Sequence, residues 1–296
     1  MIIDQPKPLF VDIETSLIPF YAFRPGKQYL THSQMIKTSI TDIICITYCY
    51  EKGKGHALTY DVSKGEDSSK IISEFDDIVR SGNYYIVGQN SDTFDVKHIN
   101  TLRLMHGLDP FPEWADLSDD TLKQVRKYFK FPTNRLDFTS KLFGLGGKTK
   151  MEFDHWRDIA EYFVMLKIIR ASGRKAARQV APIIYDHTLD IILKKGKKSY
   201  DRMCSYGIKD VVDTRAYFNK IKPYIKPKVN MATMHGDLRC TACGSPDIVK
   251  NGTRAFGSTV YQQFQCKNHG GKARGYAGRA AINVKTGQVT GKMMGR

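Results

Sequence analysis

The segment that most limits how this chain can fold is 220–228, which reads Lys-Ile-Lys-Pro-Tyr-Ile-Lys-Pro-Lys and follows a long helical pattern. Proline has no backbone N–H, and it disfavours helical backbone in the residue before it, so a helix does not continue through Pro223 and Pro227. The sequence therefore predicts a stiff basic linker at 223–235, between a large unit at residues 1–222 and a small unit at residues 236–296.

The formal charge of +16 comes from 46 Lys and Arg against 30 Asp and Glu, and it is divided unevenly between the two units. From Lys220 onward there are 14 Lys and Arg and only two acids, Asp237 and Asp247, whereas the first 219 residues hold 32 bases and 28 acids. A strongly basic segment is typical of a protein that binds a polyanion, most often nucleic acid. The alternative is a solvated tail that only aids solubility.

Composition excludes several classes of protein. With 41% hydrophobic residues the chain can build a sizeable core, which excludes intrinsic disorder. No stretch approaches the ~18 apolar residues of a membrane span, and the first eight residues lack the basic-then-apolar order of a secretory signal. We therefore expect a cytoplasmic protein without membrane contacts, whose six cysteines are thiols or metal ligands rather than disulfides.

The large unit shows the alternation of strands and helices that is typical of an α/β fold. Apolar runs rich in β-branched and aromatic residues predict strands at 9–14, 43–50, 57–60 and 84–88. Helical spacing predicts helices at 69–80 and from Val96 towards Gly107, and then at 121–131, 158–171, 176–193 and 200–221. Pro182 is expected to start a new helix or to kink the helix at 176–193.

Two carboxylates stand on the first predicted strand. Because side chains alternate along a strand, Asp12 and Glu14 leave the same face of it. Burying both is unfavourable unless a cation neutralises them, and Mg²⁺ and Mn²⁺ prefer such oxygen ligands. The simpler interpretation is an edge strand with one solvated face.

A second acidic segment, 90–95, lies between the strand at 84–88 and the next helix. Capping explains it simply, with Asp92 as the N-cap and Asp95 in the first turn, since acids are favoured at a helix N-terminus. In the functional interpretation Asp95 is a further metal ligand displayed at the end of a strand, with Asp92 as the alternative.

The last long helix carries Tyr206 and Asp210 four positions apart, so that both can face the same site. Gly207 beside them is unfavourable inside a helix by about 1 kcal/mol relative to Ala, which close packing of the helix on a sheet would explain. Otherwise the pair belongs to an ordinary polar helix surface.

In this order, Phe10 to Thr15, Asn90 to Asp95 and Tyr206-x-x-x-Asp210 resemble the three motifs of the DEDD superfamily of 3′–5′ exonucleases. The tyrosine is similar to that of the DEDDy branch of these DnaQ-like enzymes, which includes the proofreading domains of DNA polymerases. Segments 129–137 and 145–148 look like those of stand-alone exonucleases from phages and bacteria. The resemblance covers residues 8–222, within which 167–195 looks like an insertion.

The resemblance implies a ribonuclease H-like mixed sheet flanked by helices and a metal-dependent hydrolase. By position, Asp12, Glu14, Asp95 and Asp210 would hold two Mg²⁺ or Mn²⁺ ions, which lie ~3.5–4 Å apart in two-metal sites and stabilise the attacking and leaving oxygens. Tyr206 would orient the attacking water rather than deprotonate it, because an unperturbed phenol has a pKa of ~10. The implied product is a nucleoside 5′-monophosphate released from a 3′ end.

The small unit contains Cys240, Cys243, Cys266 and His269 in the pattern C-x2-C-x22-C-x2-H. Three thiolates and an imidazole form a tetrahedral set that suits one structural Zn²⁺ ion. A unit of this size with few large apolar side chains needs such a cross-link to fold. The pattern resembles the zinc ribbons of transposases and transcription factors, where Cys is commoner than His at the fourth position.

Basic and aromatic residues are interleaved in the predicted ribbon, and such residues bind phosphates and stack on bases. We expect the protein to bind single-stranded nucleic acid or 3′ ends, DNA in preference to RNA, and the ribbon to hold the nuclease near its substrate.

Two other functions compete with the exonuclease. One is a non-catalytic nucleic-acid-binding protein, which would not need four carboxylates; the other is a structure-specific endonuclease on the same fold, which the Tyr206 motif disfavours.

Overall fold

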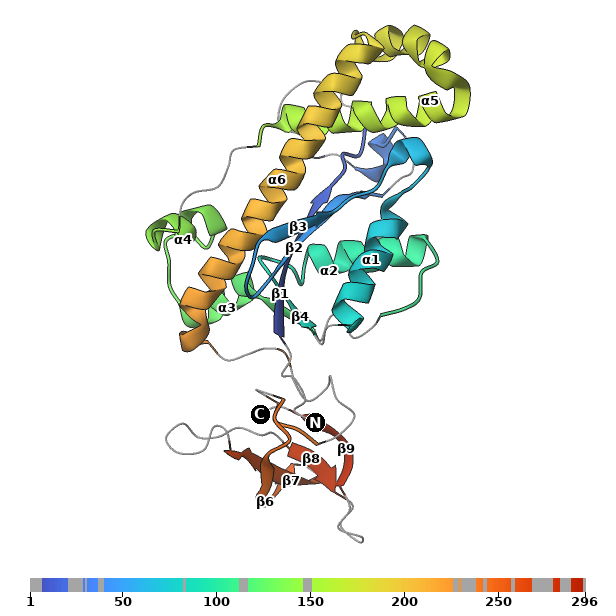
Figure 1. Cartoon of the computed structure of the whole chain (residues 1–296). Coiled ribbons are helices and arrows are strands. Elements are labelled where there is room, and N and C mark those ends of the chain that lie inside the picture. Colours follow the sequence, from blue (N-terminus) through green and yellow to red (C-terminus); the bar gives the residue numbers. More distant parts are fainter. Residues whose placement is uncertain are drawn as a thin grey trace.

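The structure is a computed structural model of the chain (Figure 1). It describes residues 7–20, 29, 31–36, 40–81, 84–111, 117–145, 151–225, 229, 238–241, 244–256, 259–267, 279–282 and 289–294. Within these ranges the chain forms a five-stranded sheet flanked by helices and a four-stranded sheet near the C-terminus.

The larger sheet has the strand order β3-β2-β1-β4-β5. Its strands are β1 (Lys7–Thr15), β2 (Ile43–Tyr50), β3 (Gly55–Leu58), β4 (Tyr84–Gly88) and β5 (Ser118–Asp120). β2 runs antiparallel to both β1 and β3, whereas β4 is parallel to β1 and β5 is parallel to β4. The sheet is therefore mixed, and the predicted α/β class is confirmed.

Helices cover both faces of this sheet. They are α1 (Ser68–Ser81), α2 (Asp95–Met105), α3 (Thr121–Tyr128), α4 (Leu136–Leu142), α5 (Phe153–Tyr185) and α6 (Leu189–Ile221), with 3-10 turns η1 (His32–Gln34), η2 (Val62–Lys64) and η4 (Lys222–Tyr224). In Figure 1, α6 crosses one face of the sheet while α1 and α2 cover the other.

The alternation of side chains along β1 joins the core to the site. Phe10 is fully buried, and its ring contacts that of Phe218 on α6 with the two centroids 5.6 Å apart. Asp12 lies two residues further along the strand and therefore leaves the same face, towards α6. One strand thus anchors the last helix and presents the first predicted site residue to it.

The hairpin of α5 and α6 differs from the predicted helices. The sequence predicts helices at 158–171, 176–193 and 200–221, but the structure has two helices that turn at 186–188. α5 is interrupted at Gly173, whose φ of 81° and ψ of 164° are not helical, within the gap predicted between 171 and 176. Pro182 lies inside the second half of α5 and does not start a new helix. The lysine-rich segment 194–198 interrupts the apolar pattern of the sequence, but α6 continues through it. The four lysines in this segment are exposed on the surface of the helix.

The apolar pattern predicts neither β5 nor α4. β5 is short and polar, and it exists because Ser118 to Asp120 pair with β4, a tertiary contact that local sequence does not encode. The helix predicted at 121–131 ends at Tyr128, and α4 follows after the intervening loop. The strand predicted at 57–60 is found two residues earlier, at 55–58.

The smaller sheet consists of β6 (Ile248–Phe256), β7 (Thr259–Cys266), β8 (Arg279–Ile282) and β9 (Val289–Met294), each antiparallel to the next. α6 ends at Ile221, the end predicted for the helix at 200–221. Residues 226–228 and 230–235 of the predicted linker at 223–235 lie outside the described residues. Within the described ranges, every helix is too short or too polar to cross a bilayer.

Candidate active site

Close packing of α6 on β2 sets the position of Tyr206 and Asp210. A Cβ on Gly207 would lie only 2.8 Å from Cγ2 and 2.9 Å from Oγ1 of Thr47, so this approach requires glycine. The prediction that Gly207 allows the helix to pack closely on the sheet is thereby confirmed. Tyr206 and Asp210 are 7% and 5% exposed, which makes them part of the buried face of α6.

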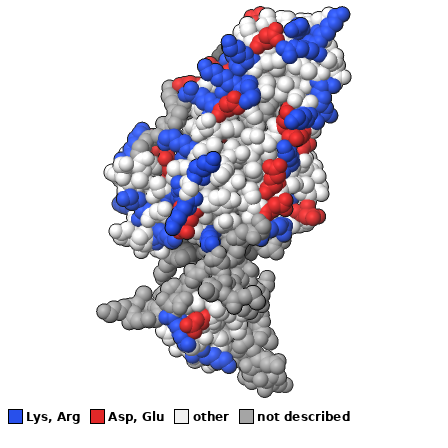
Figure 2. All heavy atoms as spheres, viewed as in Figure 1, with Lys and Arg blue, Asp and Glu red and all other residues white. Residues whose placement is uncertain are grey.

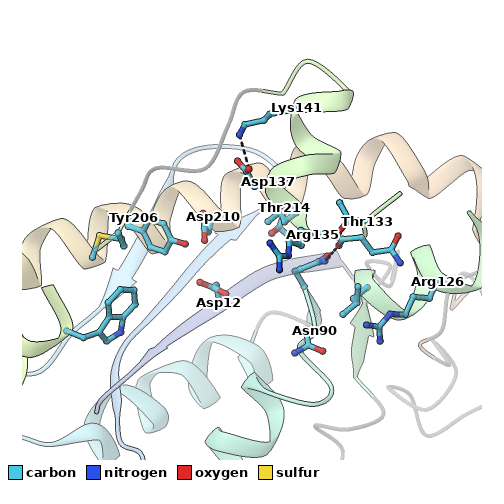
Figure 3. Close-up of a pocket in the computed structure, with 16 residues that line it drawn as sticks. Asp12, Asn90, Arg126, Thr133, Arg135, Asp137, Lys141, Tyr206, Asp210 and Thr214 are labelled. Atoms are coloured by element: carbon cyan, nitrogen blue, oxygen red, sulfur yellow. Dashed lines mark hydrogen bonds and ion pairs between the residues drawn. The ribbon is translucent and has the colours of Figure 1, made fainter. Parts of the chain in front are cut away.

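A cavity of about 1090 Å³ is shared by β1, α6 and the segments around α3 and α4 (Figure 3). Asp12, Tyr206 and Asp210 line it, and in Figure 3 the two carboxylates and the tyrosine hydroxyl point into the same space. The other lining residues are Gln89, Asn90, Leu122, Arg126, Thr133, Asn134, Arg135, Leu136, Asp137, Lys141, Met151, Trp156 and Thr214. The first strand and the last helix of the large unit therefore contribute to one site.

Glu14 and Asp95 are buried but do not line this cavity. The Oδ1 atom of Asp95 accepts a hydrogen bond of 3.0 Å from the backbone N–H of Ile13, the residue between Asp12 and Glu14. Desolvation raises the pKa of Asp95 to about 7, and the charge of Asp120 acts in the same direction against two backbone hydrogen bonds that lower it. A cation bound near Asp95 would lower this raised pKa and favour the ionised carboxylate.

The four predicted metal ligands are only partly brought together. Among the described residues, no three His, Cys, Asp or Glu side chains are arranged to hold one metal ion. Asp12 and Asp210 share the cavity, and the hydrogen bond to Ile13 holds Asp95 against β1. Their carboxylate oxygens are the donors that Mg²⁺ and Mn²⁺ prefer, so the residues fit such ions by chemistry.

The loop between β4 and α2 is shaped by Asp120 rather than by Asp92. Asn90 has a φ of 68°, which asparagine tolerates better than most residues, and its N–H donates a 2.9 Å hydrogen bond to Oδ1 of Asp120. Asp92 forms an ion pair of 2.9 Å with Lys123, and α2 begins at Asp95 without a side-chain cap. The prediction that Asp92 caps this helix is therefore wrong, and its carboxylate is held by α3.

Sequence reasoning misses Asp120, which ends β5 and caps α3. It is fully buried, its Oδ1 also accepts hydrogen bonds from the N–H groups of Leu122 and Lys123, and its Oδ2 has no hydrogen-bond partner within the described part of the chain. Burial raises the pKa of this carboxyl above its ordinary value. The available signal was an aspartate directly before an amphipathic helix, which is typical of an N-cap.

Three cations line the same cavity as the carboxylates: Arg126 on α3, Arg135 before α4, and Lys141 on α4. Lys141 forms a 2.8 Å ion pair with Asp137, marked in Figure 3, whereas neither arginine is ion-paired within the described ranges. Carboxylates beside exposed arginines suit a phosphodiester, because phosphate can be neutralised both by a cation that the acids bind and by the arginines. Only tertiary packing places α3 and α4 here.

Half of the predicted zinc set lies within the described residues. Cys240 and Cys266 are both fully buried. A tight turn follows Cys240, closed by hydrogen bonds of 2.9 Å from Gly244 N–H to Cys240 O and from Cys240 N–H to Ser245 O. Cys243 and His269 lie outside the described residues, so the Zn²⁺ ion stays a prediction.

Comparison with known proteins adds little to this geometry. No family model and no curated protein sequence matches the chain. Among solved structures the chain is similar to the family B DNA polymerase from the hyperthermophilic archaeon Pyrobaculum calidifontis, at 13% identity and a TM-score of 0.38. The match covers 86% of this chain and 32% of the polymerase. A likeness this weak identifies neither the fold family nor the activity.

Proposed function

We propose that this protein is a two-metal-ion 3′–5′ exonuclease, which hydrolyses phosphodiester bonds of nucleic acid, DNA in preference to RNA, and releases nucleoside 5′-monophosphates. The observation that carries the proposal is the common cavity of Asp12, Tyr206 and Asp210. These residues belong to the first and third motifs that resemble DEDDy exonucleases, and the cavity also holds Arg126 and Arg135.

The direction of the strands supports an active site in this cavity. A ribonuclease H-like fold is part of the proposal. In α/β sheets, ligands bind beyond the carboxyl ends of the parallel strands. β1, β4 and β5 are mutually parallel in the sheet. Their carboxyl ends carry Asp12 and Glu14, the loop from Asn90 to Asp95, and Asp120. The acidic residues therefore gather at the edge where a ligand is expected.

The acidic residues and Tyr206 would have different roles. Asp12 and Asp210 would hold divalent cations in the cavity, with Glu14 and Asp95 completing the set when Asp95 is ionised. Such cations, when bound, supply the charge that stabilises the attacking and leaving oxygens. The Tyr206 hydroxyl would position the attacking water through a hydrogen bond.

The remaining residues would hold the substrate. Hydrolysis forms a bond between the water oxygen and phosphorus and breaks the bond from phosphorus to O3′, which leaves a 3′-hydroxyl on the shortened strand. Arg126 and Arg135 would neutralise phosphates of the bound strand. The small unit would be a zinc ribbon, in which Cys240, Cys243, Cys266 and His269 hold Zn²⁺ and whose basic surface binds nucleic acid.

An end-labelled substrate assay tests the proposal. 5′-Labelled single- and double-stranded DNA and RNA are incubated with the protein and Mg²⁺ or Mn²⁺, with a chelator in parallel reactions. We expect stepwise shortening from the 3′ end, loss of turnover by at least about 10³-fold in Asp12→Ala and Asp210→Asn, and a smaller loss in Tyr206→Phe. Asp213→Asn is the matched control, since Asp213 lies on α6, pairs with Lys209 and is outside the cavity.

The other two functions predict different outcomes of the same assay. The incomplete gathering of the four carboxylates favours a protein that only binds nucleic acid. Tight binding without cleavage under every metal condition would establish that alternative, and internal cuts with intact ends would establish an endonuclease. Metal analysis of freshly purified protein tests the ribbon separately, and an absence of zinc would remove that part of the proposal.

A further inference from the structure

The positive charge of the large unit is concentrated in one place. The hairpin of α5 and α6 between residues 166 and 200, called here the basic hairpin, carries nine Lys and Arg against two acids, Asp186 and Asp190. The rest of residues 1–219 holds 23 Lys and Arg against 26 Asp and Glu, so it is slightly acidic without the hairpin. In Figure 1 this hairpin extends beyond the sheet, and Figure 2 shows basic side chains over it.

These cations are exposed and few of them have acidic partners. Two arginines, Arg174 and Arg178, share Asp190 at 2.7 and 3.8 Å, and Lys197 pairs with Asp201. Six others make no ion pair within the described part of the chain, and all six are exposed: Lys167, Arg170, Lys175, Lys194, Lys195 and Lys198. Lys194 and Lys198 also stand four residues apart on one helix, an arrangement of like charges that is unfavourable by itself.

The hairpin that displays them is a packed unit. Its two helices bury a small apolar core of Met165, Ala177, Ala181, Leu189 and Ile192. Gly196 lets the helices approach so closely that a Cβ there would lie 2.1 Å from the Cβ of Tyr162. The unpaired cations therefore project from a rigid support, which suits a partner with regularly spaced negative charge.

We propose that the basic hairpin binds the phosphate backbone of the nucleic acid upstream of the 3′ end held in the cavity. This rests on the proposed function for the position of the 3′ end. The same helix α6 carries Lys195 and, 15 residues later, Asp210, a separation of about 22 Å along the helix axis at 1.5 Å per residue. Duplex DNA rises 3.4 Å per base pair, so its backbone reaches the hairpin after about six or seven pairs.

A binding experiment on the full chain tests the inference. Blunt-ended duplexes of 4 and 18 base pairs, the shorter one held together by an interstrand cross-link, are titrated by fluorescence anisotropy in an Asp12→Ala background, which prevents cleavage if the proposed function holds. The test variant adds Lys194→Gln, Lys195→Gln and Lys198→Gln. The control adds Lys52→Gln, Lys54→Gln and Lys97→Gln, exposed lysines outside the hairpin that give the same change of charge. Circular dichroism verifies that both variants fold.

The hairpin variant should bind the 18-pair duplex about tenfold more weakly than the control does, with a salt slope reduced by about two to three. The 4-pair duplex should bind both variants alike, because it is too short to reach the hairpin from the cavity. Equal losses in both variants, or an equal loss for both duplexes, would overturn the inference. Loss of binding to vesicles of anionic phospholipid with DNA binding intact would also overturn it, since the hairpin's partner would then be a membrane surface. The titrations measure binding and not turnover. If the Asp12→Ala protein still cleaved DNA, that result would contradict the proposed catalytic role of Asp12 but not the binding of DNA by the hairpin.

Discussion

At the scale of single residues, burial determines how Asp95 responds to pH. Its carboxyl group has a pKa of about 7 in the folded protein, chiefly through desolvation, against ~3.9 for an unfolded aspartate. Between these two values the native state retains a proton that the unfolded chain has lost. The contribution of Asp95 to the free energy of unfolding is therefore neutral below pH ~4 and becomes unfavourable as the pH rises towards 7.

Asp95→Asn should therefore stabilise the metal-free protein at pH 8 and have little effect at pH 4. The upper limit is about 4 kcal/mol, since the folded pKa is about 7 against ~3.9 in the unfolded chain and each tenfold change in the ionisation constant corresponds to ~1.4 kcal/mol. Urea denaturation at both pH values measures this, with the exposed Asp77→Asn as control. A destabilised variant at pH 8 would show that the carboxylate is stabilising in its anionic form.

Gly207 is the residue whose replacement should disturb the site without removing a functional group. Gly207→Ala would stabilise an exposed helix by about 1 kcal/mol, but here the added Cβ meets Thr47 at 2.8 Å. We expect destabilisation of about 1–3 kcal/mol from overpacking. Combining it with Thr47→Ala should restore part of that loss in a double-mutant cycle. Strictly additive effects would mean that the helix and strand do not constrain each other here.

At the scale of elements, one glycine decides the path of α5. The φ of 81° and ψ of 164° at Gly173 fall in a region that side chains with a Cβ avoid, so the two halves of α5 meet at a break. Sequence periodicity identifies the helical character of 158–171, 176–193 and 200–221 but misplaces the turn, because the lysines at 194–198 interrupt the apolar pattern. The turn lies at 186–188, and on either side of it Ala181 near the end of α5 and Leu189 at the start of α6 are buried in the hairpin core.

Replacing Gly173 by Ala should therefore lower the free energy of unfolding by about 1–3 kcal/mol. The neighbouring Ser172→Ala, also exposed, serves as the control and should be neutral or slightly stabilising because alanine favours the helix. Thermal denaturation compares the two. An unchanged midpoint in Gly173→Ala would indicate that α5 runs straight through this position.

At the scale of the whole molecule, charge is divided between a slightly acidic body and two basic regions. The acids gather at the carboxyl ends of β1, β4 and β5, while the excess Lys and Arg lie in the basic hairpin and after Lys220. Such a division separates the proposed chemistry from the binding of the phosphate backbone, which depends on salt.

Ending the chain after Ile225 should accordingly weaken nucleic-acid binding and reduce its salt dependence, while leaving turnover on short, saturating substrates within about twofold. Binding should persist in part, because the basic hairpin remains. Single-turnover kinetics and anisotropy titrations at several salt concentrations measure the two quantities. Loss of turnover on saturating substrate would show that the small unit contributes to the catalytic site.

The sequence by itself determined the α/β class, the strands at β1, β2 and β4, the end of α6 and the shared face of Tyr206 and Asp210. These features depend on local periodicity and on residues such as proline that act on their own backbone. The break at Gly173 falls within the gap predicted between the helices at 158–171 and 176–193. The polar strand β5 and helix α4 were not predictable in this way.

Only the tertiary structure decided which side chains share a cavity. Asp12 and Asp210 share the cavity because Gly207 leaves room for the side chain of Thr47 where α6 packs on β2. Arg126 and Arg135 line the same cavity because α3 and α4 pack nearby. Asp95 is instead held by the N–H of Ile13, and Asp92 by Lys123. Sequence spacing fixes the direction of a side chain from its own helix or strand. Contacts between elements depend on the packing of the whole chain, and these contacts set the burial and charge of the site.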